Sequence, residues 1–136
     1  MQMRLIANPD AHTAAVYKVA RAVYAETGAT SLPVVEAMVS TIANIAARDG
    51  RDYVEIVSDP YLFSAQNSDS PRHELMNVPA NNRAFQMCVR VVQRMMRGGL
   101  ADSVRGAVRF HRADEMPAWA TARGYIADVD GVLFYL

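Results

Sequence analysis

The strongest constraint on the fold is a set of three segments in which apolar residues recur at i, i+3, i+4 and i+7. This spacing places them on one face of an α-helix. The first segment predicts a helix from about Ala11 to Thr27, ended by Gly28. The second helix is capped by Ser31 and ends at "RDGR", and the third runs from about Arg83 to Arg97. Three apolar faces must be buried together, so we expect residues 1–136 to form one domain.

The C-terminal part changes to a strand pattern. "GAVRFH", "GYIADV" and "VLFYL" are short runs enriched in β-branched and aromatic residues. An Asp-Gly pair separates the last two runs, and this pair between apolar runs is typical of a tight hairpin turn. The expected fold class is α+β, with a mainly helical body and a small C-terminal antiparallel sheet.

Residues 51–82 lack a long helix pattern. "DYVEIVSDP" indicates a short helix or turn, closed by Pro60. Residues 60–82 are polar, contain three prolines and show no periodicity. A stretch of this length inside a compact domain is typical of a binding loop or a lid.

Composition argues against several classes of function. The 14 basic and 14 acidic residues cancel, so bulk charge favours no nucleic-acid partner. No apolar run approaches the length of a membrane span, and the first residues lack the apolar core of a signal peptide. Cys88 is the only cysteine; it excludes an intrachain disulfide and falls on an apolar helix face, as a core residue does. The 3 histidines have no metal-ligand spacing, so no metal or other cofactor is expected.

Glu26 is the residue of greatest chemical interest. It follows Val19 by seven positions and Val23 by three, which places it beside the apolar stripe of the first helix. One interpretation is a glutamate at the rim of that face, with its carboxyl in water. The other is a carboxyl in a half-apolar cleft, kept protonated by desolvation and suited to act as a general acid. Spacing leaves both open.

Aromatic and histidine side chains have two interpretations as well. His12 and His73 fall in segments expected to be exposed, whereas His111 ends "GAVRFH" and either supports the sheet or faces a cleft. Trp119 either stacks on a sugar ring or closes a small core.

Five segments, taken in order, resemble the SleB-like cell wall hydrolases, also called spore cortex-lytic enzymes. They are "ARAVYAETGA", "VSTIANIAARD", "IVSDPYLFSAQN", "GAVRFHRADEMPAWA" and "VLFYL". They are similar to the Ala-Arg-x-x-Tyr-x-Glu opening, the Asn-bearing helix, the Phe-Ser segment, the Tyr-His…Pro-x-Trp-Ala segment and the final Phe-Tyr of that family. Together they span about residues 16–135.

The resemblance implies a lysozyme-like domain related to lytic transglycosylases. Its substrate would be peptidoglycan, cut between N-acetylmuramic acid and N-acetylglucosamine in the cell envelope, periplasm or extracellular space. Glu26 matches the catalytic glutamate, which would serve as both general acid and general base. Its cleft would lie between the first helix, residues 60–82 and the C-terminal sheet. Candidate sugar-binding residues are Tyr24, Ser64, Gln66, His111 and Trp119, and Arg109 or Arg112 would face substrate carboxylates.

The chain departs from the family pattern near Glu26 and elsewhere. Ala25 precedes the glutamate, Thr27 and Gly28 follow it, Ile45 replaces an arginine, and Val132 replaces a histidine. A second carboxylate is left open among Asp59, Asp69, Glu74, Asp114 and Glu115. The alternatives are an amide-cleaving wall enzyme, or a non-catalytic peptidoglycan-binding or phage/envelope structural module with a degenerate lysozyme-like fold.

Overall fold

The computed structural model describes residues 8–136, so the N-terminal segment discussed above lies largely outside the described residues. The described chain forms four α-helices, two 3₁₀ helices and three strands. In order, these are α1 (Pro9–Thr27), α2 (Leu32–Asp49), α3 (Tyr53–Val57), η1 (Ser64–Gln66), η2 (His73–Asn77), α4 (Arg83–Met96), β1 (Arg109–Arg112), β2 (Tyr125–Val129) and β3 (Val132–Tyr135). The predicted α+β class is confirmed.

The three long helices begin and end at local signals. Asn8, Ser31 and Asn82 each accept a hydrogen bond from a backbone N–H in the first turn of the helix that follows. Because Asn8 provides the cap and Pro9 tolerates the first helical position, α1 begins two residues before the predicted Ala11. Gly28 closes α1 in the left-handed conformation with φ 69°, which a side chain would disfavour.

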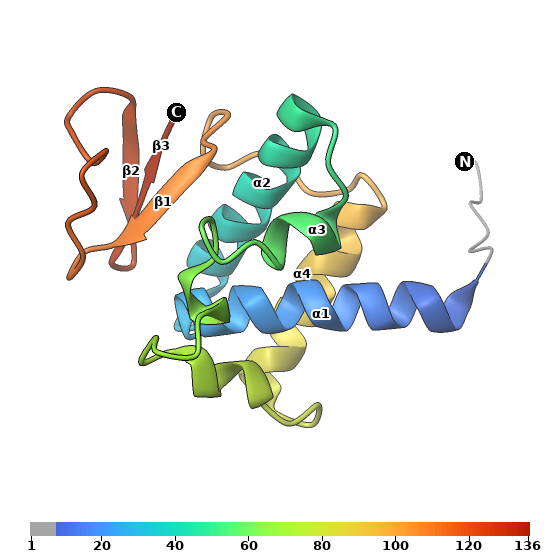
Figure 1. The fold of residues 1–136 in the computed structure, drawn as a ribbon. Coiled ribbons are helices and arrows are strands. Elements are labelled where there is room, and N and C mark those ends of the chain that lie inside the picture. The colour runs from blue at the N-terminus through green and yellow to red at the C-terminus, as the bar shows by residue number, and fades with distance from the viewer. Residues whose placement is uncertain (1–7) are drawn as a thin grey trace.

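The helices α1, α2 and α4 bury their apolar stripes against one another. Figure 1 shows α1 crossing the helical body, with α4 behind it and the sheet at the end where α1 finishes. Val19, Val23, Ile42, Phe85 and Val92 are fully buried in this core. Cys88 is also buried there, as predicted, and burial raises the pKa of its thiol to about 12.

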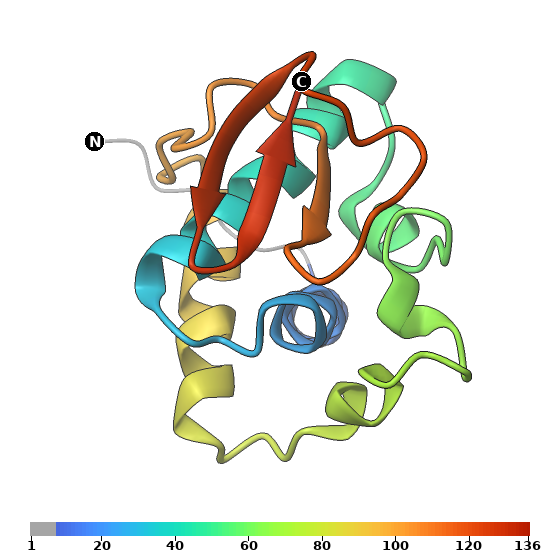
Figure 2. The same cartoon turned by 90° about the vertical axis from the view of Figure 1, so that its left-hand side faces the viewer.

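The three strands form an antiparallel sheet in the order β1-β3-β2. The predicted hairpin is confirmed: Asp130 and Gly131 connect β2 to β3 with φ 53° and 85°, the positive values that a type I′ turn requires. Phe134 of β3 contacts Phe110 of β1, which in turn contacts Phe63. This aromatic row packs the sheet against residues 60–82. Figure 2 shows the three strands from the sheet side.

Residues 60–82 have more local structure than the sequence indicated. They contain η1 and η2, and Phe63 anchors them because it is fully buried. His73 was expected to be solvated but is half-buried, and its Nδ1 donates to the Ala65 carbonyl at 2.8 Å. This bond joins η2 to η1 and holds the segment against α1.

Candidate active site

Glu26 lies in the last turn of α1, and its side chain faces inward. The residue is 2% exposed, so the interpretation as a rim glutamate is wrong. Its Oε1 accepts hydrogen bonds from the Ser64 hydroxyl and the Ala65 N–H of η1, each at 3.3 Å. Its Oε2 is buried and makes no hydrogen bond with the described residues. Glu26 is therefore a largely desolvated carboxyl held by one of its two oxygens.

Burial raises the pKa of the Glu26 carboxyl above its ordinary value, because the ionised form is poorly solvated there. The Arg72 guanidinium and the Ala65 N–H act in the opposite direction, and the negative charge of Glu115 raises the pKa further. Desolvation is the largest of these effects. The geometry thus favours a carboxyl that keeps its proton at higher pH than a solvated glutamate does.

Arg72 and Glu115 complete the surroundings of this carboxyl. Arg72 Nη2 lies 3.3 Å from Glu115 Oε1, 3.4 Å from the Ser64 hydroxyl and 4.0 Å from Glu26 Oε1. Glu115 Oε1 also accepts from the Arg112 N–H, and the Arg112 side chain donates to the Glu26 carbonyl. We call Glu26, Ser64, Arg72 and Glu115 the carboxyl cluster.

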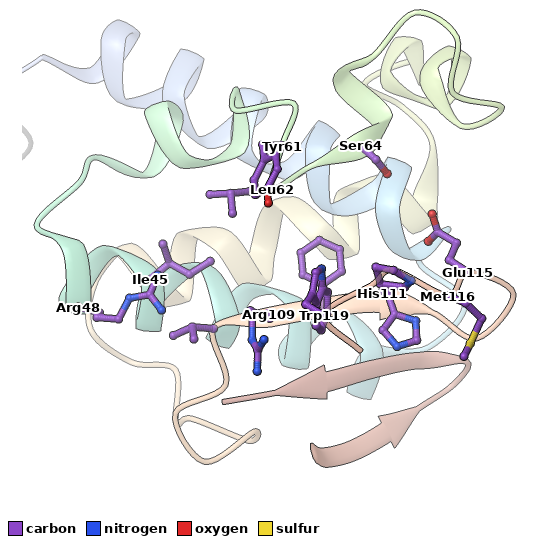
Figure 3. Close-up of a pocket in the computed structure, with 13 residues that line it drawn as sticks. Ile45, Arg48, Tyr61, Leu62, Ser64, Arg109, His111, Glu115, Met116 and Trp119 are labelled. Atoms are coloured by element: carbon purple, nitrogen blue, oxygen red, sulfur yellow. The ribbon is translucent and has the colours of Figure 1, made fainter. Parts of the chain in front are cut away.

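A pocket of about 670 Å³ opens beside this cluster, between residues 60–82, α2 and the sheet. Figure 3 shows Ser64 and Glu115 near one end of the pocket and Ile45 and Arg48 at the other. Glu26 is not itself a lining residue. Ser64 and Glu115 connect it to the pocket, since both line the cavity and both belong to the carboxyl cluster. The remaining lining residues are Tyr61, Leu62, Val108, Arg109, Phe110, His111, Met116, Pro117 and Trp119.

One wall of the pocket is built from stacked rings. His111 of β1 is 6% exposed and stacks on Tyr135 at 5.4 Å between ring centres. Trp119 meets both rings edge-on, and the Arg109 guanidinium lies 4.8 Å from the centre of the Trp119 ring. We call Arg109, His111, Trp119 and Tyr135 the aromatic cluster.

Both ring nitrogens of His111 are used within the protein. Nδ1 lies 2.7 Å from the Arg112 carbonyl, which can only accept, so Nδ1 carries the proton. Nε2 then accepts from the Tyr135 hydroxyl at 2.8 Å. His111 lines the pocket with both of its hydrogen-bonding groups satisfied, which suits a supporting role better than proton transfer.

The predicted site residues divide into two groups. Ser64, His111 and Trp119 line the pocket, and Glu26 contacts Ser64. Tyr24 and Gln66 lie elsewhere: Tyr24 packs edge-on against Phe85, and the Gln66 amide donates to the Val57 carbonyl at 2.8 Å. Both support the structure around the site.

The sequence predicts that Arg109 or Arg112 faces substrate carboxylates. Arg109 lines the pocket, but its guanidinium donates twice to the Leu136 carbonyl oxygen and lies over Trp119. Arg112 instead donates to the backbone of Glu26. Each therefore already has a partner within the protein.

The structure adds two residues to the predicted site. Of the five carboxylates that the sequence leaves open as a second carboxylate, Glu115 is the one that pairs with Arg72 beside Glu26. Arg72 carries no sequence signal, because residues 60–82 show no periodicity and arginine is common in the rest of the chain. No group of three or more His, Cys, Asp or Glu side chains within residues 8–136 is placed to share a metal ion. In the same range, no helix combines the length and apolarity needed to cross a membrane.

Comparison of the sequence with models of known protein families, with curated proteins and with solved structures found no match.

Proposed function

We propose that the protein cleaves the glycan strands of peptidoglycan between N-acetylmuramic acid and N-acetylglucosamine, as a lytic transglycosylase on a lysozyme-like fold. One observation supports this most directly: a single carboxyl, Glu26, is buried beside a pocket and has a raised pKa. The resemblance of five ordered segments to the SleB-like hydrolases supports the same function and places its action in the cell envelope.

In the first step Glu26 acts as a general acid. A carboxyl that stays protonated can donate its proton to the oxygen that leaves N-acetylmuramic acid C1. The C1–O bond breaks, and N-acetylglucosamine departs with a free 4-hydroxyl. Glu26 becomes a carboxylate, with the Ala65 N–H and the Ser64 hydroxyl positioned to donate to it.

In the second step Glu26 acts as a base. It removes the proton of the muramoyl 6-hydroxyl, whose oxygen forms a bond to C1 and closes a 1,6-anhydro ring. The proton taken by Glu26 restores its starting state, and no water is consumed. The cycle needs one carboxyl that reaches both the leaving glycosidic oxygen and the muramoyl 6-hydroxyl. Most glycosidases use two carboxyl groups instead.

The pocket has the dimensions and surfaces that sugar rings require. Its volume of about 670 Å³ is typical of small-molecule sites, and its lining combines aromatic rings with a few polar groups. Tyr61, from residues 60–82, and Trp119, from the connection after β1, both line the cavity (Figure 3). Aromatic side chains of this kind are suited to stacking on the apolar faces of pyranose rings.

Glu26→Gln tests the proposal, since the amide keeps the shape of the side chain but cannot donate and recover a proton as the acid does. Loss of general acid catalysis is expected to lower the rate of peptidoglycan solubilisation by roughly a factor of a thousand. Glu55→Gln, on the exposed side of α3, is the matched control. Mass spectrometry should detect 1,6-anhydromuramoyl products; wild-type rates for Glu26→Gln would contradict the assignment.

A second function is supported by the enclosure of Glu26. A carboxyl that is 2% exposed and absent from the pocket lining is also what a non-catalytic glycan-binding module would retain. In that case the wild-type protein and Glu26→Gln would sediment equally with insoluble peptidoglycan, and neither would release soluble fragments.

A further inference from the structure

Arg72 is placed between the two carboxyl groups of the site. It precedes η2, and its side chain is 15% exposed. Its Nη2 faces Glu26 from α1, Ser64 from η1 and Glu115 from the connection after β1. The three elements that build this end of the pocket thus converge on one guanidinium nitrogen.

The two carboxyl groups are not equivalent partners of Arg72. Glu115 Oε1 lies at 3.3 Å, within hydrogen-bond reach, whereas Glu26 Oε1 lies at 4.0 Å. Glu115 is 41% exposed and Glu26 only 1% by side chain. This asymmetry is expected where Glu26 holds its proton, because a guanidinium approaches a neutral carboxyl less closely than a charged carboxylate.

Two buried polar atoms lack hydrogen-bond partners, one on Glu26 and one on Arg72. Among the described residues, Glu26 Oε2 and Arg72 Nε make no hydrogen bond although neither is exposed to solvent. A buried polar atom without a partner is unfavourable, because it has lost its hydrogen bonds to water and gained none in the protein. Because Arg72 Nη2 lies 4.0 Å from Glu26 Oε1, a small movement of the guanidinium would bring it within hydrogen-bond reach of the Glu26 carboxyl.

We propose that Arg72 is a positioning residue shared by the two carboxyl groups: it pairs with Glu115 while Glu26 holds its proton, and it moves onto Glu26 when that proton has been transferred. Arg72 would then stabilise the carboxylate that forms as the glycosidic bond breaks. When Glu26 recovers a proton, Arg72 returns to Glu115.

The other charged groups near Glu26 are poorly placed for this role. Arg112 uses its guanidinium on the Glu26 carbonyl, not on the carboxyl. His73 of η2 uses Nδ1 on the Ala65 carbonyl. The two other groups that donate to the Glu26 carboxyl are the Ser64 hydroxyl and the Ala65 N–H. Neither carries a charge, and both already donate to Oε1. Of the groups named here, Arg72 is therefore the cation that can pair with Glu26 when Glu26 is ionised.

The role in turnover rests on the proposed function, but the exchange of partners does not require a substrate. The test is therefore a titration of the Glu26 side-chain carboxyl carbon by ¹³C NMR in the wild type, Arg72→Gln and Glu115→Gln. Arg72→Gln removes the cation and should raise the pKa of Glu26. Glu115→Gln removes a like charge and frees Arg72 for Glu26, so it should lower the pKa of Glu26.

Matched controls are Arg90→Gln and Glu74→Gln, which change the same charges at exposed positions on α4 and η2 and should leave the Glu26 titration unchanged. Arg72→Lys is the second variant, for use if Arg72→Gln does not fold. It keeps the positive charge, but an ammonium group cannot bridge two carboxyl groups as a guanidinium does. Its Glu26 titration should fall between those of the wild type and Arg72→Gln.

A Glu26 pKa that rises or stays constant in folded Glu115→Gln would overturn the proposal. In turnover, Arg72→Gln is expected to lower kcat about tenfold with little change in KM, because the contact with Glu26 forms after substrate has bound. Should Glu26→Gln remain fully active, the proposed function fails, while opposite shifts in the two titrations would still support Arg72 and Glu115 as the two charges that act on Glu26.

Discussion

The carboxyl cluster and the aromatic cluster lie on the same pocket but differ in how completely their polar atoms are paired. In the aromatic cluster, both nitrogens of His111 and the Tyr135 hydroxyl have partners at 2.7–2.8 Å. In the carboxyl cluster, the contacts to Glu26 are longer and two buried atoms have none. Satisfied groups fix a surface, whereas buried groups without partners can take a new hydrogen bond when their surroundings change. This difference is the basis for the roles that we propose: support and stacking for the aromatic cluster, and proton transfer for the carboxyl cluster.

The largest effect on stability is expected at the aromatic cluster. His111→Ala removes a buried ring, opens a cavity beside Trp119 and leaves the Tyr135 hydroxyl without its partner. Together these should lower the free energy of unfolding by roughly 3 kcal/mol. Urea unfolding measures the change, with His12→Ala in the first turns of α1 as the control. Little loss of stability would remove the contrast between the clusters.

Binding tests the second part of the comparison. Trp119→Ala should weaken binding of a glycan oligosaccharide about tenfold, which corresponds to about 1.4 kcal/mol of stacking. Calorimetry in the Glu26→Gln background avoids cleavage of the ligand. Tyr125→Ala is the matched control, because Tyr125 contacts Tyr135 but does not line the pocket. Equal affinities for Trp119→Ala and the control would show that this wall does not bind sugar.

In the carboxyl cluster, Glu26→Gln should increase the stability of the protein, whereas His111→Ala in the aromatic cluster lowers it. The raised pKa of Glu26 means that its contribution to stability is complete below the unfolded pKa and is lost as pH rises through the folded value. Glu26→Gln cannot ionise, so it should be more stable than the wild type by about 1 kcal/mol at pH 8 and similar to it at pH 4. Thermal unfolding across this pH range measures the difference. A stabilisation that is the same at both pH values would point to packing instead of ionisation.

The smallest effect is expected at the rim. Tyr61 lines the pocket but is 90% exposed, so Tyr61→Ser should change the free energy of unfolding by less than about 0.5 kcal/mol. Any weakening of oligosaccharide binding would then reflect a lost contact with the ligand. Thermal unfolding and calorimetry on the same sample separate the two effects.

Most of the fold could be predicted because its signals are local. Capping residues, apolar spacing and the Asp-Gly turn each act over a few residues, and the helices and hairpin follow them closely. The 3₁₀ helices could not be predicted in the same way. They depend on burial of Phe63 and on the bond from His73 to Ala65, which form only when the segment packs against α1.

The site was predictable to the extent that it rests on Glu26. Spacing left its environment open, and only the tertiary structure places Ala65 and Arg72 beside it. Tyr24 and Gln66 lie within segments that resemble the family, but packing and hydrogen bonding direct both side chains away from the pocket. Glu115 was one of five equivalent carboxylates in the sequence until the fold brought it to Arg72.

The strand order has a consequence for how the protein is made. β1, which carries His111, pairs with β3 and not with β2, so it has no sheet partner until residues 132–135 have left the ribosome. Helices α1, α2 and α4 precede β1 along the chain and contain the local contacts that form quickly. During synthesis the helical body can therefore assemble with Glu26 in place, while the wall that completes the pocket forms only afterwards.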